Sequence, residues 1–183
     1  PVTDPGDAAS LGLFSLDKGA FDLEALAKAG LDPALLPGVG EGLLAGGGPL
    51  GLPVCVGIGD NQASFLGASG GALDHAVINL GTGGQVSAYS PRLVRVPGLD
   101  TRPFPGGGYL LVGASLCGGS AYALLERFYR QVAEMVTGQA QPPCYDAMAR
   151  LLEAAPPADC PVVDTTFKGT RQNPQLRGAI TGL

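Results

Sequence analysis

The sequence has little positive charge and no cluster of it. Eleven Lys and Arg residues stand against sixteen Asp and Glu residues, which gives a net charge of −5. No basic run could neutralise a series of phosphates, so the composition argues against nucleic-acid binding. No apolar stretch reaches the roughly 18–20 residues of a membrane helix, and no signal peptide opens the chain. We therefore expect a cytoplasmic protein with no nucleic-acid and no membrane partner.

Metal-binding cysteine pairs are also missing. The four cysteines form no CxxC pair, and His75 is the single histidine. This spacing argues against zinc, so the chain is predicted to supply no metal ligands. Cys55 and Cys117 lie in apolar contexts, where a cysteine is usually a small buried hydrophobe. We expect reduced structural thiols, although the count alone would also allow two disulfides in a secreted protein.

Glycine and proline, by contrast, are abundant. Thirty glycines and sixteen prolines make up about a quarter of the chain. They stand mostly between apolar runs, and 45% of the residues are hydrophobic, so they indicate turns and close backbone approach in a globular protein. The exception is the segment 37–51, which we expect to be a glycine-rich surface loop.

Short strands and helices alternate along the chain, which indicates an α/β or α+β fold. The spacing of apolar residues predicts helices over residues 22–29, 61–69, 120–136 and 145–155. Ser120 is the expected N-cap of the third helix, and Met148, Leu151 and Leu152 should point inward from the fourth. Strands are expected over residues 52–58, 75–80, 85–89 and 109–114, with an irregular connector over residues 91–105.

A carboxylate and two carboxamides follow the predicted strand 52–58. Gly59-Asp60-Asn61-Gln62 stands between that strand and a helix, and ligands of α/β proteins gather at such strand ends. Asp60 could accept a hydroxyl proton while Asn61 or Gln62 holds neighbouring hydroxyls. The alternative is that Asp60 simply caps the helix.

Two glycine clusters offer candidate anion sites. Gly81-Thr82-Gly83-Gly84 lies at a hairpin tip, where backbone N–H groups and a hydroxyl can converge on phosphate oxygens. Gly118-Gly119-Ser120 opens the long helix, and helix N-termini attract anions. A tight turn and close helix–strand packing are the respective alternatives. Since the sequence contains neither GxxxxGK[ST] nor the protein-kinase signatures, any phosphoryl transfer would need a different fold.

Three segments, in order and spacing, resemble the FGGY carbohydrate kinases. They are Thr3-Asp4 with Asp7-Ala8-Ala9-Ser10, then Gly59-Asp60-Asn61-Gln62-Ala63, then Asn79-Leu80-Gly81-Thr82-Gly83. The closing segment Gly178–Leu183 is similar to the opening of the family's C-terminal signature. Within the family, residues 113–119 and 167–171 look most like sedoheptulokinases.

The resemblance implies an actin-like, ribonuclease H-like ATPase fold of two lobes, with sugar and ATP in the cleft between them. Residues 1–69 would be the C-terminal part of the sugar-binding lobe I, and residues 70–183 the N-terminal part of the nucleotide-binding lobe II. On this mapping Asp60 matches the general base, and Asn61 and Gln62 are substrate contacts. The nucleotide side would comprise Gly81, Thr82, Gly83, Gly118 and Gly119.

The implied reaction moves the γ-phosphoryl group of ATP to a hydroxyl of a ketose, with sedoheptulose favoured. Mg²⁺ would bridge ATP oxygens and be held mainly through water and phosphate. Kinases of xylulose, ribulose or glycerol share the pattern, and a non-catalytic actin-like nucleotide-binding module is the alternative outside enzymes. We expect an internal fragment without significant turnover on its own, and the sequence leaves homo-oligomerisation of the full-length protein open.

Overall fold

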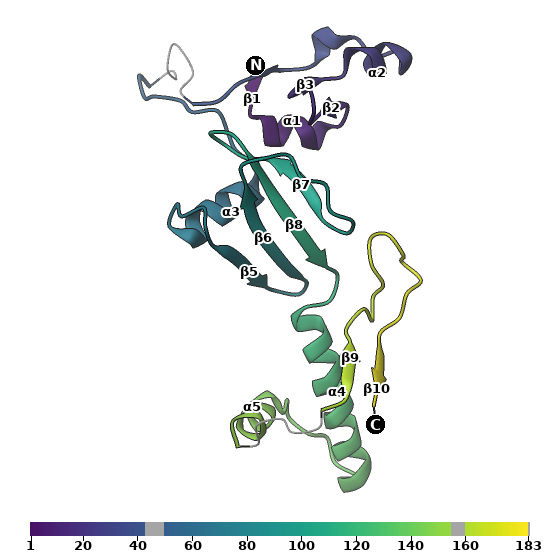
Figure 1. Cartoon of the computed structure of the whole chain (residues 1–183). Helices are drawn as coiled ribbons and strands as arrows, with labels where there is room; N and C mark the ends of the chain where they lie inside the picture. Colours follow the sequence, from purple (N-terminus) through teal and green to yellow (C-terminus); the bar gives the residue numbers. More distant parts are fainter. Residues whose placement is uncertain (43–49, 155–159, 183) are drawn as a thin grey trace. The chain divides into compact units, whose positions relative to one another are not determined.

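The computed structural model describes residues 1–42, 50–154 and 160–182 (Figure 1). Helices and strands alternate, so the predicted α/β character is confirmed. The chain divides into two compact units: Pro1–Ile78 with Val86–Gly113, and Asn79–Gln85 with Ala114–Leu183. The predicted lobe boundary after Ser69 does not coincide with this division by contacts, and it stays a prediction.

The first unit begins with two pairs of short strands and two short helices. Strand β1 (Val2–Thr3) pairs in parallel with β4 (Gly38–Val39), and β2 (Phe14–Ser15) pairs antiparallel with β3 (Ala20–Phe21). Asp4 caps helix α1 (Pro5–Leu11), and Asp22 caps α2 (Leu23–Lys28), as Asp side chains do when they accept orphan N–H bonds. The predicted helix over 22–29 is therefore confirmed.

The main sheet has the strand order β5-β6-β8-β7. The strands are β5 (Ala76–Leu80), β6 (Gly84–Ser90), β7 (Asp100–Pro103) and β8 (Tyr109–Ser115). The strands predicted over 75–80, 85–89 and 109–114 are confirmed. The connector predicted over 91–105 contains β7, which pairs antiparallel with β8 despite the proline at its end. A proline is tolerated there because β7 is an edge strand.

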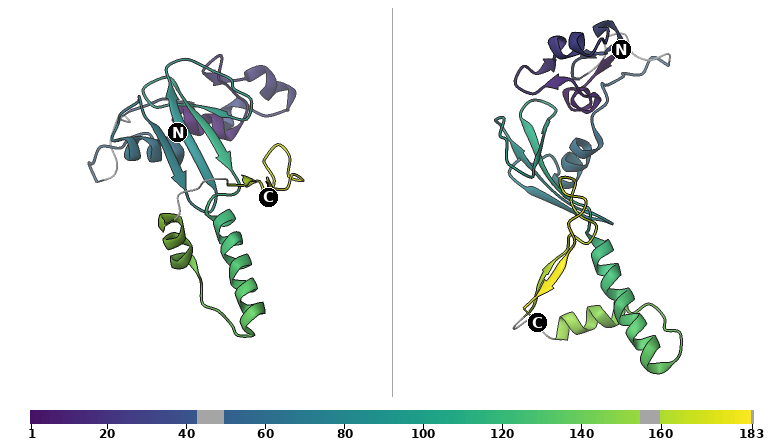
Figure 2. Two further views of the ribbon diagram at one scale, coloured as in Figure 1. Left: turned by 60° about the horizontal axis from the view of Figure 1, so that its bottom comes forward. Right: turned by 90° about the vertical axis from the view of Figure 1, so that its right-hand side faces the viewer.

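Helix α3 (Asp60–Ser69) lies against this sheet (Figure 2). Phe65 of α3, Phe104 and two residues of β8, Leu110 and Val112, form the buried core. The rings of Phe65 and Phe104 meet edge to face with centroids 5.7 Å apart, a preferred aromatic geometry. Gly70 follows the helix in the left-handed conformation, and the helix end at Ser69 agrees with the predicted helix over 61–69.

The strand predicted over residues 52–58 is wrong. The segment has no strand beyond an isolated bridge at Cys55, and the Val56 amide donates a hydrogen bond to the Gly42 carbonyl. Pro53 has no backbone N–H to donate, and Gly57 weakens extended structure. The apolar run therefore forms no regular strand in a sheet. Residues 43–49 of the predicted glycine-rich loop lie outside the described residues.

The second unit is built on helix α4 (Gly119–Thr137), followed by α5 (Tyr145–Ala154). Strands β9 (Val162–Asp164) and β10 (Ala179–Thr181) form an antiparallel hairpin. Both predicted helices are confirmed, but the predicted N-cap is wrong: Gly118 caps α4, and no side chain makes a cap bond there. Met148 is buried as predicted, whereas Leu151 and Leu152 are 70% and 64% exposed, so their predicted inward orientation is wrong.

A buried carboxylate fastens α4 to the segment that follows it. Glu126 is 4% exposed, and its Oε1 accepts bonds from the Cys144 amide at 3.1 Å and from Arg130 Nε at 3.2 Å. Arg130 also donates to Glu134, which in turn accepts the Gln141 amide. These charge-assisted bonds satisfy a carboxylate that burial would otherwise penalise.

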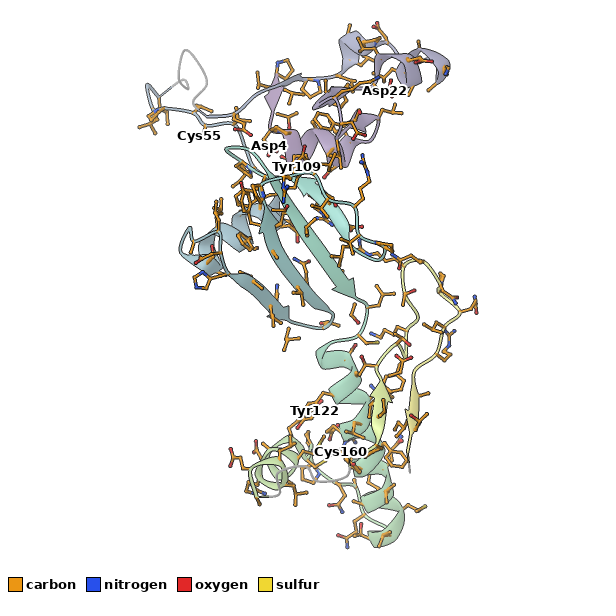
Figure 3. The ribbon with its side chains drawn as sticks, in the orientation of Figure 1. Asp4, Asp22, Cys55, Tyr109, Tyr122 and Cys160 are labelled. Atoms are coloured by element: carbon orange, nitrogen blue, oxygen red, sulfur yellow. The ribbon has the colours of Figure 1, made fainter. Side chains whose placement is uncertain are left out.

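All four cysteines are free thiols, as predicted. Cys117 is buried, but Cys55 is exposed (Figure 3), so the expectation of a buried hydrophobe at Cys55 is wrong. No helix in the described part of the chain is long and apolar enough to cross a membrane.

Truncation of Phe65 tests this account of the core. Phe65→Ala removes a fully buried ring and leaves a cavity, so we expect the free energy of unfolding to fall by about 3–5 kcal/mol. Urea unfolding followed by circular dichroism measures the change. A loss below about 1 kcal/mol would mean that α3 does not depend on this contact.

Candidate active site

Asp60 is the first residue of α3 and its carboxylate is exposed to solvent. Gly59 is the N-cap, with no side-chain cap bond, so the interpretation of Asp60 as a mere cap is wrong. The neighbouring Asn61 Nδ2 donates to Asp60 Oδ1 at 3.1 Å. The turn therefore presents a carboxylate and a carboxamide side by side at the start of a helix.

Asp7, from the first turn of α1, lies close enough to Asp60 for their charges to interact, and Asp4 lies beside Asp7. Asp4 is 1% exposed, and its oxygens accept the amides of Gly6 at 3.1 Å and Asp7 at 2.8 Å. Partial burial, together with the negative charges of Asp4 and Asp60, raises the pKa of Asp7 above its usual value of 3.8. The first turns of α1 and α3 thus bring the carboxylates of Asp7 and Asp60 close together in the first unit.

The buried side chain of Gln62 lies beside both of these turns. Its side chain is 3% exposed, and Nε2 donates a 2.9 Å hydrogen bond to the carbonyl of Pro103 at the end of β7. The resemblance implied a substrate contact for Gln62. That role stays a prediction, while the structure shows the carboxamide bound to the protein's own backbone.

The glycine-rich hairpin tip Gly81–Gly83 lies against the start of α4 within the second unit. The amides of Gly118 and Ser120 donate to the Thr82 carbonyl, at 2.9 and 3.2 Å, and the Gly119 amide donates to Gly81 at 2.8 Å. The two glycine clusters predicted separately therefore form one interlocked feature. Thr82 itself is exposed.

This interlock changes how the start of α4 could act. The sequence left two interpretations, amides open to an anion or close packing of the helix, and the structure shows hairpin carbonyls accepting the amides of Gly118, Gly119 and Ser120. A Cβ on Gly118 would overlap the Gly83 carbonyl, and one on Gly83 would lie 2.7 Å from the Ser115 carbonyl. Close packing therefore explains these glycines, and a nucleotide contact by Gly118 and Gly119 stays a prediction.

The predicted site residues thus fall into two groups. Asp60, Asn61 and Gln62 belong to the first unit, and the two glycine clusters to the second. A crevice shared by the two groups stays a prediction. The sequence reasoning gave no site role to Asp4 and Asp7, although an Asp followed by a proline is a recognisable start of a helix. Among the described residues, no group of three or more His, Cys, Asp or Glu side chains is placed to hold a metal ion.

Gly118→Ala tests the interlock. The new Cβ would collide with the hairpin backbone, so we expect a loss of about 1–3 kcal/mol in the free energy of unfolding. Gly67→Ala in α3 is the matched control, because its Cβ would meet open space and the substitution should stabilise the helix by about 0.5–1 kcal/mol. Equal effects of the two substitutions in urea unfolding would contradict the interlock.

Asp7→Asn tests the charge clustering. Because the folded-state pKa of Asp7 is raised, its ionisation costs stability as the pH rises through that pKa, and the cost is absent below 3.8. We therefore expect the variant to be more stable than the parent protein at pH 7, with the difference vanishing below pH 3.8. Urea unfolding across this pH range measures it, and a less stable variant at pH 7 would contradict the clustering.

The amino-acid sequence is similar to those of known sugar kinases. No model of a known protein family matches the chain. The chain is 34% identical over 138 residues to sedoheptulokinase of Mus musculus, a match that covers 67% of this chain and 29% of that protein. It is 39% identical over 103 residues to xylulose kinase of Streptomyces coelicolor, covering 50% of this chain and 21% of that protein. The chain thus spans less than a third of these curated relatives.

The fold points to the same proteins. The crystal structure of xylulose kinase from Rhodospirillum rubrum matches all of this chain over 38% of its own length, with a TM-score of 0.78 and 26% identity. The chain has part of the actin-like, ribonuclease H-like ATPase fold of such kinases, as predicted. It is a homologue of the FGGY carbohydrate kinases, and it corresponds to a part of their length.

Proposed function

We propose that the full-length native protein containing this chain is an ATP-dependent carbohydrate kinase. It transfers the γ-phosphoryl group of ATP to a hydroxyl of a ketose, with sedoheptulose as the first candidate. The observation that carries the proposal is the exposed Asp60 carboxylate, held by Asn61 at the start of α3 in a homologue of sugar and polyol kinases.

In phosphoryl transfer the protein mainly aligns the reacting groups and stabilises the charge of the transition state. Phosphoryl transfer passes through a loose transition state, so a base must orient the attacking hydroxyl and accept its proton. Asp60 is proposed to do this, with Asn61 Nδ2 fixing one carboxylate oxygen and leaving the other to the sugar. Asn61 and Gln62 are the predicted substrate contacts, and Gln62 could reach a sugar only by leaving Pro103.

The residues at the hairpin fit a phosphate group only in part. Thr82 is exposed at the tip, and its hydroxyl is of the type that bonds phosphate oxygens. Gly81, Thr82 and Gly83 are therefore the proposed phosphate contacts. Gly118 and Gly119 support the hairpin tip through their backbone amides and close packing. ATP supplies the transferred group when bound. Mg²⁺ is proposed to be held through phosphate and water, which suits an ion that keeps part of its hydration shell.

The substrate is proposed from similarity, so it needs a direct assay. The similarity to the mouse relative named sedoheptulokinase supports sedoheptulose as the substrate. The similarity to relatives named xylulose kinase supports xylulose. Ratios of kcat/KM for sedoheptulose, xylulose, ribulose and glycerol, measured on the full-length protein, separate these candidates. Activity on none of the four would favour the alternative, a non-catalytic nucleotide-binding module. The cytoplasmic location and the oligomeric state stay predictions.

Asp60→Asn tests the proposed base. The amide cannot accept the hydroxyl proton, so we expect kcat of the full-length protein to fall by about 10²–10⁴-fold while nucleotide affinity is unchanged. Asp74→Asn makes the same chemical change at an exposed site and should keep full activity. Unchanged kcat in Asp60→Asn would overturn the assignment.

A further inference from the structure

We propose that Gln62 is a positioning residue: its buried carboxamide fixes the first turn of α3 and thereby aims the Asp60 carboxylate at the sugar hydroxyl. This inference rests on the proposed kinase function. It gives Gln62 a different role from the substrate contact that the resemblance implies.

The first observation is the long-range bond of the carboxamide. Gln62 Nε2 donates to the Pro103 carbonyl at 2.9 Å, across 41 positions of sequence. Pro103 ends β7 and precedes Phe104, whose ring packs on Phe65 of α3. Because buried polar groups are costly when unpaired, the bond holds the turn at a fixed place on the sheet.

The second observation is the space that the carboxamide fills. A Cβ on Gly6 would lie 2.5 Å from Gln62 Nε2, and a Cβ on Gly59 would lie 2.6 Å from Gln62 Oε1. The carboxamide therefore sits between the first turn of α1 and the residue that precedes Asp60. Glycine at both positions leaves the room that the Gln62 side chain occupies.

The third observation is how Asp60 is held among the described residues. Its side chain is exposed, its turn has no side-chain cap, and its carboxylate accepts a bond from the partly exposed Asn61. The direction in which the Asp60 side chain points is therefore set mainly by the position of its backbone. Gln62, two residues further along, is the buried polar group that anchors this backbone. Small misplacements of a catalytic group cost rate, so an anchor here affects kcat.

Gln62→Glu in the full-length protein is the first test. The variant keeps the side chain's size but replaces the Nε2 donor with a carboxylate oxygen facing the Pro103 carbonyl. We expect kcat to fall at least tenfold while KM for the sugar changes less than threefold. Gln131→Glu, an identical chemical change at an exposed site on α4, is the matched control and should leave both unchanged.

A double-mutant cycle supplies the second test. Gly59→Ala alone forces the Gln62 carboxamide aside and should lower kcat. With Gln62→Ala already present there is no carboxamide to displace, so adding Gly59→Ala should change kcat by less than twofold. Multiplicative losses in kcat, or a raised KM for the sugar at unchanged kcat, would overturn the positioning role.

The outcomes separate this inference from the proposed function. If Asp60→Asn retains full turnover, the proposed base is wrong whatever Gln62 does. If Asp60→Asn is inactive but folded Gln62→Glu keeps the parental kcat with only a lower melting temperature, Gln62 is merely structural and this inference alone fails.

Discussion

The close approach of the first turns of α1 and α3 is the constraint on which the pairing of the Asp7 and Asp60 carboxylates depends. It exists because Gly6 and Gly59 have no side chains and the Gln62 carboxamide occupies the space between them. The same approach brings the charge of Asp7 close to that of Asp60. Each turn is fixed separately by hydrogen bonds: Asp4 accepts the amides of Gly6 and Asp7 at the start of α1, and Gln62 of α3 donates to the Pro103 carbonyl.

A similar principle governs the second unit, where a hairpin tip and a helix start interlock through backbone alone. Carbonyls of Gly81 and Thr82 accept amides that would otherwise be orphan donors at the start of α4. The helix thereby loses part of its capacity to bind an anion directly. The same bonds support the hairpin tip that carries the exposed Thr82, which is why the phosphate contacts are proposed at the hairpin and not at the start of the helix.

Much of the apolar surface of α4 and α5 is exposed. Phe128 and Met135 on α4 are 58% and 77% exposed, and the buried residue of that helix is the charged Glu126. Tyr122, Leu125 and Tyr129 of α4 line an apolar groove together with Met148 and Leu151 of α5. Helical spacing therefore predicted both helices correctly, and it placed Met148 of α5 correctly but not Leu151 and Leu152.

The sequence by itself determined the α/β class, most of the regular elements, the free thiols and the turn that carries Asp60. These follow from local rules, since apolar period, helix caps and glycine at helix ends act over a few residues. Only the tertiary structure decided that the run 52–58 joins no ladder, that Gln62 is buried against Pro103 and that the amides starting α4 are already bonded. Each of these depends on which backbone groups, distant in sequence, come close to the segment. A local sequence pattern does not specify those groups.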